Sequence, residues 1–399
     1  MSYNQVSGGN CRLALYKETS PGVVDVTDDG VVLSMLSETM SVSPNKQNSA
    51  VISGKRGSGK PYEGEPEYSG GVVLAPYAPV MGHVLRALCG APTTTADATV
   101  AIDGAVVDEG NGYVSLPCTG NTFIQDTVIT IDGTTNYDGS YRVEYGSSAV
   151  ELVIKSAFTA ETIDGATATR GRATTDDFYK HVFKLPKKQP TVTVEKYLDY
   201  DAGAATNSYI LFQSCKVNGI EFSFGGGDEV NFNLDFSVGS GEAKPISICS
   251  NEPDLLPAVP FMDKEFAIWL NGNRVGDIDS GSMSLAFGIE AKSALGDLGK
   301  RSRQPEGDPV CTATLTAFLE HDEYALLSQN STTIPFELSC SGSQGEEFRV
   351  GFQESEISTS SAQISGKTGL TQDITVTSFV DEADEAVTFT LINRVASYN

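Results

Sequence analysis

Apolar and polar residues alternate along much of the chain, and this pattern predicts antiparallel β structure. The clearest run is 230–238, where five apolar side chains fall on one face of a strand and polar side chains fall on the other. A second run at 217–224 precedes it across a glycine-rich turn, so the two runs predict a hairpin. Runs at 347–352 and 372–379 predict a matching hairpin, which a strand at 386–392 closes.

One segment has a convincing helical period. Pro79 presets the first turn of this helix, and Gly90 can supply a left-handed residue that ends it. The apolar positions between them recur at helical spacing, at Val80, Val84, Leu85 and Leu88. A shorter helix is predicted at 322–327, where two acidic residues suit the positive end of the helix dipole.

The same order of features occurs twice along the chain. In the first half, a strand pattern at 37–42 is followed by a Gly-Lys-Arg triplet, an acidic-proline step, an apolar run at 72–74 and the helix. In the second half, a strand pattern at 280–285 is followed by the same triplet and step, an apolar run at 310–319 and the shorter helix. The repetition predicts a duplicated unit, as in a ring or array built from paired modules.

The stretch between residues 91 and 175 has no partner in the second half. It has strand patterns of its own at 126–132, 140–145 and 150–154, separated by turns rich in Gly, Asn and Asp. A length of about eighty residues is enough for a small all-β domain. Because insertions are tolerated at exposed loops, we expect this domain to stand on the outside.

Two long segments, 43–71 and 292–308, are rich in Gly, Pro, Lys and Arg and lie between predicted strands of one sheet. Loops of this length are uncommon in a compact domain unless they act on something outside it. We therefore expect them to be arms that become ordered on a neighbouring subunit. The candidate contact residues of these arms are Lys55, Arg56, Lys60, Tyr62, Lys300, Arg301 and Arg303.

The chain is strongly acidic. It has 27 Lys and Arg against 52 Asp and Glu, a formal net charge of −25, which argues against binding nucleic acid by neutralising phosphates. Repulsion between an acidic wall and DNA would instead shorten each contact, so such a protein can guide DNA without holding it.

Cysteine usage and the first residues indicate where the protein is made. The seven cysteines are scattered singly without a C-x-x-C spacing, so we expect buried apolar residues in a reducing compartment. The chain starts without a signal-peptide pattern, and no apolar run is long enough to span a membrane. The sequence therefore predicts synthesis in a cytoplasm and no membrane anchor.

Candidate chemistry is weak throughout. Residues 54–60 fit the G-x-x-x-x-G-K part of a phosphate-binding loop, but Pro61 replaces the hydroxyl residue that would hold Mg²⁺. The three histidines, His83, His181 and His321, lack metal spacing and a companion nucleophile motif. Paired carboxylates are expected on the surface of so acidic a chain. We predict no catalytic residue, no cofactor and no metal site, and no enzyme activity.

The order of these elements resembles the major tail tube protein of long-tailed, non-contractile (siphovirus-type) bacteriophages. The resemblance covers roughly 1–92 and 176–399. Its motifs are Glu38-Thr39-Met40, Gly70-Gly71-Val72 leading into the first helix, the strand at 215–222 and the segment 299–319. It implies β-sandwich or barrel modules with a short flanking helix, an inner sheet that joins neighbours into a closed channel, and loops that reach between rings.

We accordingly expect a mainly β fold of two tandem tail-tube-type modules with an inserted, immunoglobulin-like all-β domain. The expected boundaries are 1–92 with 175–245 for the first module, 93–174 for the exterior insertion, and 246–399 for the second module. The candidate residues of the inner sheet are Asn231, Asn233, Asp235, Thr375 and Thr377. Which face of the sheet points into the channel is left open by the sequence.

The resemblance implies a virion protein that assembles with itself around DNA in transit, without specific binding to it. The resemblance implies six modules around each ring. Because this chain carries two modules, a trimer with pseudo-sixfold symmetry is favoured over a hexamer. Tape-measure, tail-terminator and tip proteins are the expected partners. Two alternatives remain, a host-surface adhesin or fibre protein and a carbohydrate-active β enzyme, although one Trp, Trp269, offers little for a sugar platform.

Overall fold

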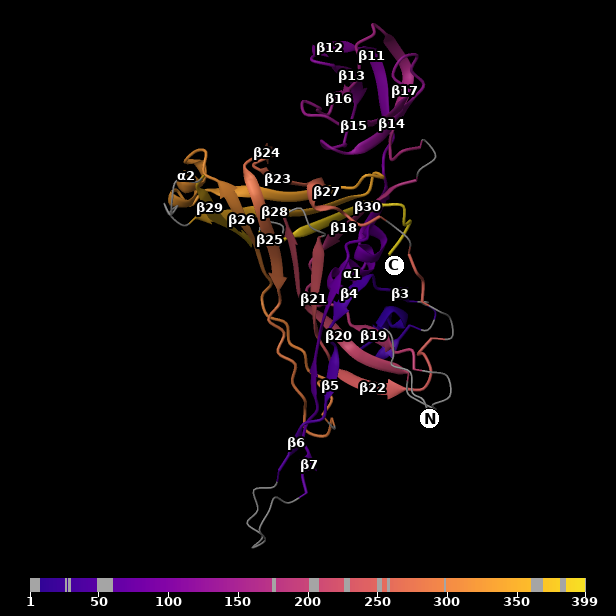
Figure 1. Cartoon of the computed structure of the whole chain (residues 1–399), viewed down its shortest axis with the longest axis vertical. Helices are drawn as coiled ribbons and strands as arrows, with labels where there is room; N and C mark the ends of the chain where they lie inside the picture. Colours follow the sequence, from indigo (N-terminus) through magenta and orange to yellow (C-terminus); the bar gives the residue numbers. More distant parts are fainter. Residues whose placement is uncertain are drawn as a thin grey trace.

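The computed structural model is elongated, with a small β domain at one end, a large twisted sheet in the middle and two narrow arms at the other end (Figure 1). It describes residues 8–25, 27, 30–48, 60–173, 177–200, 208–225, 230–249, 253–256, 259–297, 299–359, 369–380 and 385–398. Within these residues, no helix is long and apolar enough to cross a membrane.

The part of the chain before and after the small domain contributes these elements to the body and the first arm: η1 (Gly8–Asn10), β1 (Arg12–Ser20), β2 (Val23–Val24), β3 (Val31–Val32), β4 (Met35–Glu38), β5 (Ser41–Ser43), β6 (Lys46–Gln47), β7 (Tyr62–Glu63), β8 (Glu67–Ser69), β9 (Gly71–Leu74), α1 (Ala78–Cys89), β10 (Thr93–Ala96), β18 (Tyr179–Lys184), β19 (Val192–Tyr197), β20 (Tyr209–Phe224), β21 (Asn231–Ser237) and β22 (Ser240–Lys244).

The second half of the chain contributes η2 (Asp263–Glu265), β23 (Phe266–Leu270), β24 (Asn273–Val275), β25 (Ile278–Ala286), β26 (Val310–Phe318), α2 (Glu323–Gln329), β27 (Thr333–Ser341), β28 (Glu347–Thr359), β29 (Thr371–Phe379) and β30 (Thr388–Asn393).

One continuous run of antiparallel pairings crosses the body, in the order β4, β9, β21, β20, β25, β26, β29, β28, β27, β23 and β24. Both halves use the same arrangement around one long strand. In the first half β20 lies between β21 and β19, and β19 pairs in turn with β1. In the second half β28 takes the place of β20: it lies between β29 and β27, and β27 pairs in turn with β23. β22 and β30 each pair with the first part of the long strand of their half.

The predicted hairpin of β20 and β21 is confirmed, with Phe222 opposite Phe232; the turn residues 226–229 lie outside the described residues. The second predicted hairpin is wrong in its pairing. β29 pairs with residues 354–359 of β28, whereas residues 347–351 pair with β30. The cause is the length of β28, thirteen residues, over which one strand can exchange partners.

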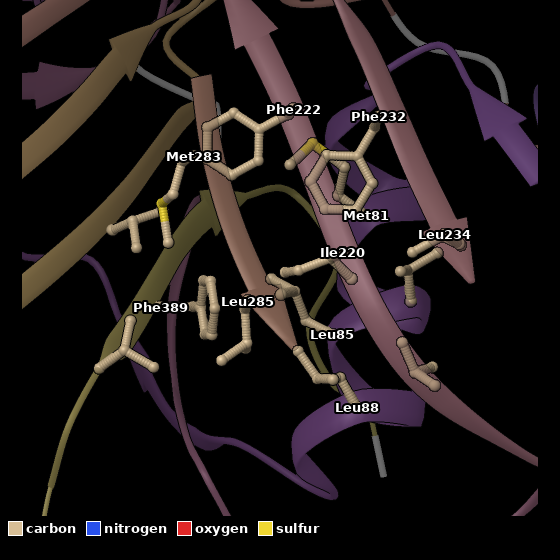
Figure 2. Packing of buried hydrophobic residues seen from close by; sticks show 14 of the residues in the cluster. Met81, Leu85, Leu88, Ile220, Phe222, Phe232, Leu234, Met283, Leu285 and Phe389 are labelled. Atoms are coloured by element: carbon tan, nitrogen blue, oxygen red, sulfur yellow. The ribbon is translucent and has the colours of Figure 1, made fainter. Parts of the chain in front are cut away.

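The helix α1 is confirmed and lies at the centre of the core. A proline occupies its first turn, and Gly90 ends it at φ 83° while its N–H donates to the carbonyl of Arg86. Side chains from β20, β21 and β25 pack over it (Figure 2), and nine of its twelve residues are buried. Gly82 is required there because a Cβ would overlap the ring of Tyr398, which closes over the helix.

The small domain is a seven-stranded curled sheet with its own buried core. Its strands are β11 (Val100–Ala105), β12 (Val107–Gly110), β13 (Tyr113–Thr119), β14 (Val128–Asp132), β15 (Gly139–Arg142), β16 (Glu151–Lys155) and β17 (Thr162–Arg170), which include the strands predicted in this region. The preceding strand β10 pairs with β18 in the large sheet, so the separate sheet begins at Val100.

A buried ion-pair cluster fixes the small domain to the body. Arg170, at the end of β17, contacts Asp97 at 2.5 Å and Glu347 at 2.7 Å, and Arg349 contacts the second oxygen of Glu347. Burial alone would raise the pKa of Glu347, but the charges of Arg349 and Arg170 outweigh it and lower the pKa to about 2. The carboxylate is therefore charged at neutral pH and joins both parts of the molecule.

All seven cysteines are free thiols, six of them buried. Burial raises the pKa of the Cys118 thiol to about 11, and it raises the pKa values of Cys89, Cys215, Cys311 and Cys340 as well. These thiols are protonated at neutral pH, which agrees with their predicted role as small apolar residues.

Candidate functional site

A polar face extends across eight neighbouring strand segments of the body: β4, β9, β21, the end of β20, β25, β26, β29 and the end of β28. Residues directly opposite one another form rows across these strands. One row contains Asn233, Glu221, Ser284, Thr312 and Thr377, and the next contains Asn231, Ser223, Ser282, Thr314 and Thr375. The alternating residues on the other face, such as Phe222, Phe232 and Met283, are buried.

All five predicted inner-sheet residues lie on this polar face. Asn231, Asn233, Thr375 and Thr377 belong to the two rows, and Asp235 lies opposite Gly219 on the same side. The helix α1 packs against the opposite face (Figure 2), so the polar face is the one turned away from the helix. The sequence alone could not assign this side, because it does not reveal where the helix packs.

The polar face carries acidic groups without basic ones. The eight strand segments contain no Lys or Arg in any position. Their exposed acids on this face are Glu221, Asp235, Glu356 and Asp373, and Asp373 accepts a hydrogen bond from Thr316. A polyanion close to this face would meet carboxylates, amides and hydroxyls, but no side-chain cation.

The arms leave the body together. The first is a narrow ribbon in which β5 pairs with β8 and β6 with β7, and the second turns back on itself where Lys292 pairs with Arg303. The Ser293 hydroxyl donates to Glu65 at 2.7 Å, so the arms contact each other within one chain. Figure 1 shows the ribbon of the first arm extending beyond the body.

The predicted arm residues are distributed unevenly. Lys55 and Arg56 lie outside the described residues. Lys60 is exposed, and Tyr62 is 53% exposed while its hydroxyl donates to Gln47 at 3.0 Å. These two residues are accessible on the outer part of the first arm.

The second arm is held at its base. The backbone N–H of Arg301 donates to Gly239, and its guanidinium donates to the carbonyl of Tyr68 at 3.1 Å and lies over the Tyr68 ring. Lys300 and Arg303 are exposed beside it. With Lys188 and Lys216 they line an open cavity of ≈ 630 Å³, a basic site on an acidic chain. Sequence reasoning missed this cavity because its cations come from three separate segments.

The histidines and acids do not form a recognisable reaction centre. His181 is buried between the Thr94 hydroxyl and the carbonyl of Val395, and burial lowers its pKa. Among the residues that the structure describes, no group of three or more His, Cys, Asp or Glu side chains could hold a metal ion.

The comparison with protein families decides the identity. The family model described as phage tail tube protein matches residues 8–378, nearly the whole chain. The chain belongs to the phage tail tube protein family. No curated protein matches it.

The tail tube protein is thus a structural component of the virion and not an enzyme. Family membership implies that it polymerises with itself into the tube. The matched region includes the first half of the body, the small domain, both arms and the second half up to residue 378, so the polar face and the arms belong to a subunit of a polymer.

Proposed function

We propose that three copies of this tail tube protein form each ring of the tube, with two modules per chain and pseudo-sixfold symmetry. The modules are 1–99 with 171–245 and 246–399, with the small domain, 100–170, inserted in the first. The observation that carries the proposal is the shared arrangement of strands around β20 and β28. Because β25 of the second half pairs with β20 of the first, the two sheets already form one wall.

We propose that the polar face lines the channel. Four strands from each half contribute to it, hence eight per chain. Twenty-four strands from three chains, spaced about 4.8 Å apart, have a circumference of about 115 Å and a diameter of about 37 Å before strand tilt widens it. Such a barrel is wide enough for a DNA duplex with side chains on its inner wall.

The charge of the face supports passage of DNA without binding. Phosphates within about 8 Å of the wall, the Debye length at physiological ionic strength, are repelled by Glu221, Asp235, Glu356 and Asp373. A wall with lysines would release counterions from DNA and hold it. The channel is therefore an acidic conduit for DNA ejection.

The arms and the small domain suit the outside of such a ring. We propose that both arms extend from one ring to the next, with Lys60, Tyr62, Lys300 and Arg303 at the contacts. The small domain, joined through Arg170, would decorate the exterior. Tape-measure, tail-terminator and tip proteins are the expected partners at the tube interior and ends.

Electron microscopy of the purified, concentrated protein tests this proposal, with rotational averaging of end-on views. Rings or tubes with three peripheral knobs around a sixfold wall are expected. Six knobs would keep the tube but refute the two-module chain. Persistent monomers under all conditions, including addition of preformed tail tips, would refute the proposed ring.

A further inference from the structure

The two halves of the chain meet along a single pair of strands. β25 adds to the end of β20, from Gly219 opposite Ala286 to Phe224 opposite Gly281. Met283 and Leu285 of the added strand also pack over α1 (Figure 2). This internal junction therefore does two things: it extends the sheet and it covers the helix of the receiving half.

The two ends of the eight-strand run have complementary free edges. Among the described residues, β4 pairs with β9 alone, and Leu36 at this edge is 50% exposed. At the other end, residues 357–359 of β28 pair with β29 on one side, while the pairing with β27 stops at Glu356 and the Thr359 N–H donates to the Ser328 hydroxyl of α2 at 3.4 Å. Open edges of this kind are sites where another strand adds.

The helix next to the second free edge lacks the cover that α1 has. α1 is enclosed by its own sheet, by β18 and β30, and by Tyr398. α2 packs on β28 but buries Tyr324 alone of its seven residues. Leu326 is 48% exposed, and Leu319, which precedes the helix in the chain, is 39% exposed. This apolar surface adjoins the open edge of β28.

The matching pairings give the register of the missing contact. β21 and β29 begin their pairing with the long strands at Ser237 opposite Lys216 and at Phe379 opposite Glu354. We count four residues back along β21 and along β29 and then cross to the residue paired on the long strand. This makes Ser358 of β28 the counterpart of Glu221 of β20. Following the pairings onward, across β9 to β4 in the first half and across β26 to β25 in the second half, makes Thr39 the counterpart of Ser284. Glu221 lies opposite Ser284 within the chain.

We propose that a second copy of this chain docks its β4 edge beside the end of β28, with its Thr39 opposite Ser358, and covers α2. The junction between chains then repeats the junction within the chain, and this inference rests on the ring proposed above. The donor edge and the acceptor edge differ, so each copy binds the next in one direction until the ring closes.

A second contact follows from the same correspondence. β22 pairs with β20 in the same way as β30 pairs with β28. The segment that follows β22 is therefore the counterpart of the segment that follows β30, the C-terminal tail that covers α1. Ile246 in this segment is 73% exposed. The docked copy brings this side chain to the apolar surface around Leu326.

Disulfide cross-linking tests the register. Opposite residues of antiparallel strands have Cα atoms about 4.5–5.5 Å apart, which is within the span of a disulfide. A register shifted by two residues moves the two Cα atoms beyond that span. The T39C/S358C double variant, assembled into rings and mildly oxidised, is expected to give covalent dimers and trimers on a non-reducing gel. The matched internal pair E221C/S284C is expected to form its disulfide at monomer mobility, and the slipped pair S37C/S358C and the single variants are expected to remain monomeric.

The possible results distinguish a failure of the proposed junction between chains from a failure of the proposed ring. Rings in which T39C/S358C stays monomeric, or in which the slipped pair cross-links better, would overturn the junction and leave the ring intact. Absence of rings in the unmodified protein would refute the ring, and the junction with it.

A charge on α2 tests the covered surface without a disulfide. L326D places a carboxylate on a half-exposed position, so the monomer should fold normally by circular dichroism, while the protein concentration required for ring formation rises at least about tenfold. V150D, at a 62% exposed position of the small domain, is the matched control and should assemble normally. Wild-type assembly of L326D would overturn the proposal.

Discussion

Replacement of Glu347 by Gln should loosen the attachment of the small domain. The carboxylate is fully buried and lies between two guanidinium groups, Arg170 at 2.7 Å and Arg349. The neutral amide would keep the volume but remove the carboxylate that Arg349 contacts and leave Arg170 with Asp97 alone. Removal of one partner from a buried charge network is among the most destabilising single changes.

The shift of the Glu347 pKa sets the size of the effect. Lowering it from 4.5 to about 2 corresponds to about 3 kcal/mol of stability at neutral pH. This value agrees with the roughly 3–5 kcal/mol expected for breaking a buried ion pair. For a cooperative unit of 150–250 residues, E347Q should lower the melting temperature by about 6–12 °C.

Differential scanning calorimetry of the unassembled protein measures this loss. E109Q, at an exposed carboxylate of the small domain, is the control and should melt within about 1 °C of wild type. Removing the cation that loses its contacting carboxylate as well, in E347Q/R349M, should restore part of the loss. The reasoning is refuted if E347Q melts like the control.

The pH dependence gives an independent check. Glu347 has a lower pKa in the folded than in the unfolded protein, so its contribution is complete above about pH 4.5 and disappears as the pH falls towards 2. The difference in melting temperature between wild type and E347Q should therefore be constant from pH 7 to about 5 and shrink below pH 4.5. A difference that grows on acidification would contradict this assignment.

Three further predictions concern assembly and transport. E221K/D235K should leave tubes intact but slow DNA ejection, most strongly at low salt, because lysines on the channel wall would hold phosphates; E109K is the control, and unchanged ejection would show that this face does not line the channel. Deletion of residues 55–62 should abolish ring stacking in electron micrographs while the circular dichroism spectrum stays native, and normal tubes would refute the role of the arms. Deletion of residues 100–170, which spares β10, should leave tube assembly intact, and an unfolded remainder would show that the small domain is not an independent insertion.

Local patterns predicted individual elements well. The helix α1 could be recognised from Pro79, Gly90 and the apolar spacing between them, and β21 from strict alternation, because these signals act within a few residues. The strand β10 carried no such signal: Thr93–Ala96 is mostly threonine, and its place in the large sheet depends on pairing with β18.

Contacts between distant residues could not be predicted in the same way. The pairing of β28 with β30, the contact of Ser293 with Glu65 and the pairing of Arg170 with Glu347 all join segments more than 30 residues apart. Alternation alone puts Asn231, Asn233 and Asp235 on one side of β21, so part of the polar face could be predicted from the sequence. Its orientation depended on where α1 packs.

The absence of Lys and Arg from the eight strand segments of the polar face has a consequence for how this gene can vary. In a polymer, one codon change is copied into every subunit of every ring. If this face lines the channel as proposed, a single new lysine on it would recur in every ring of the tube, and its weak contact with the DNA would be repeated at every ring. The same change on the small domain would be copied equally often but, with that domain on the exterior as proposed, would not meet the DNA. We therefore expect basic substitutions to be tolerated on the exterior and eliminated from these strands.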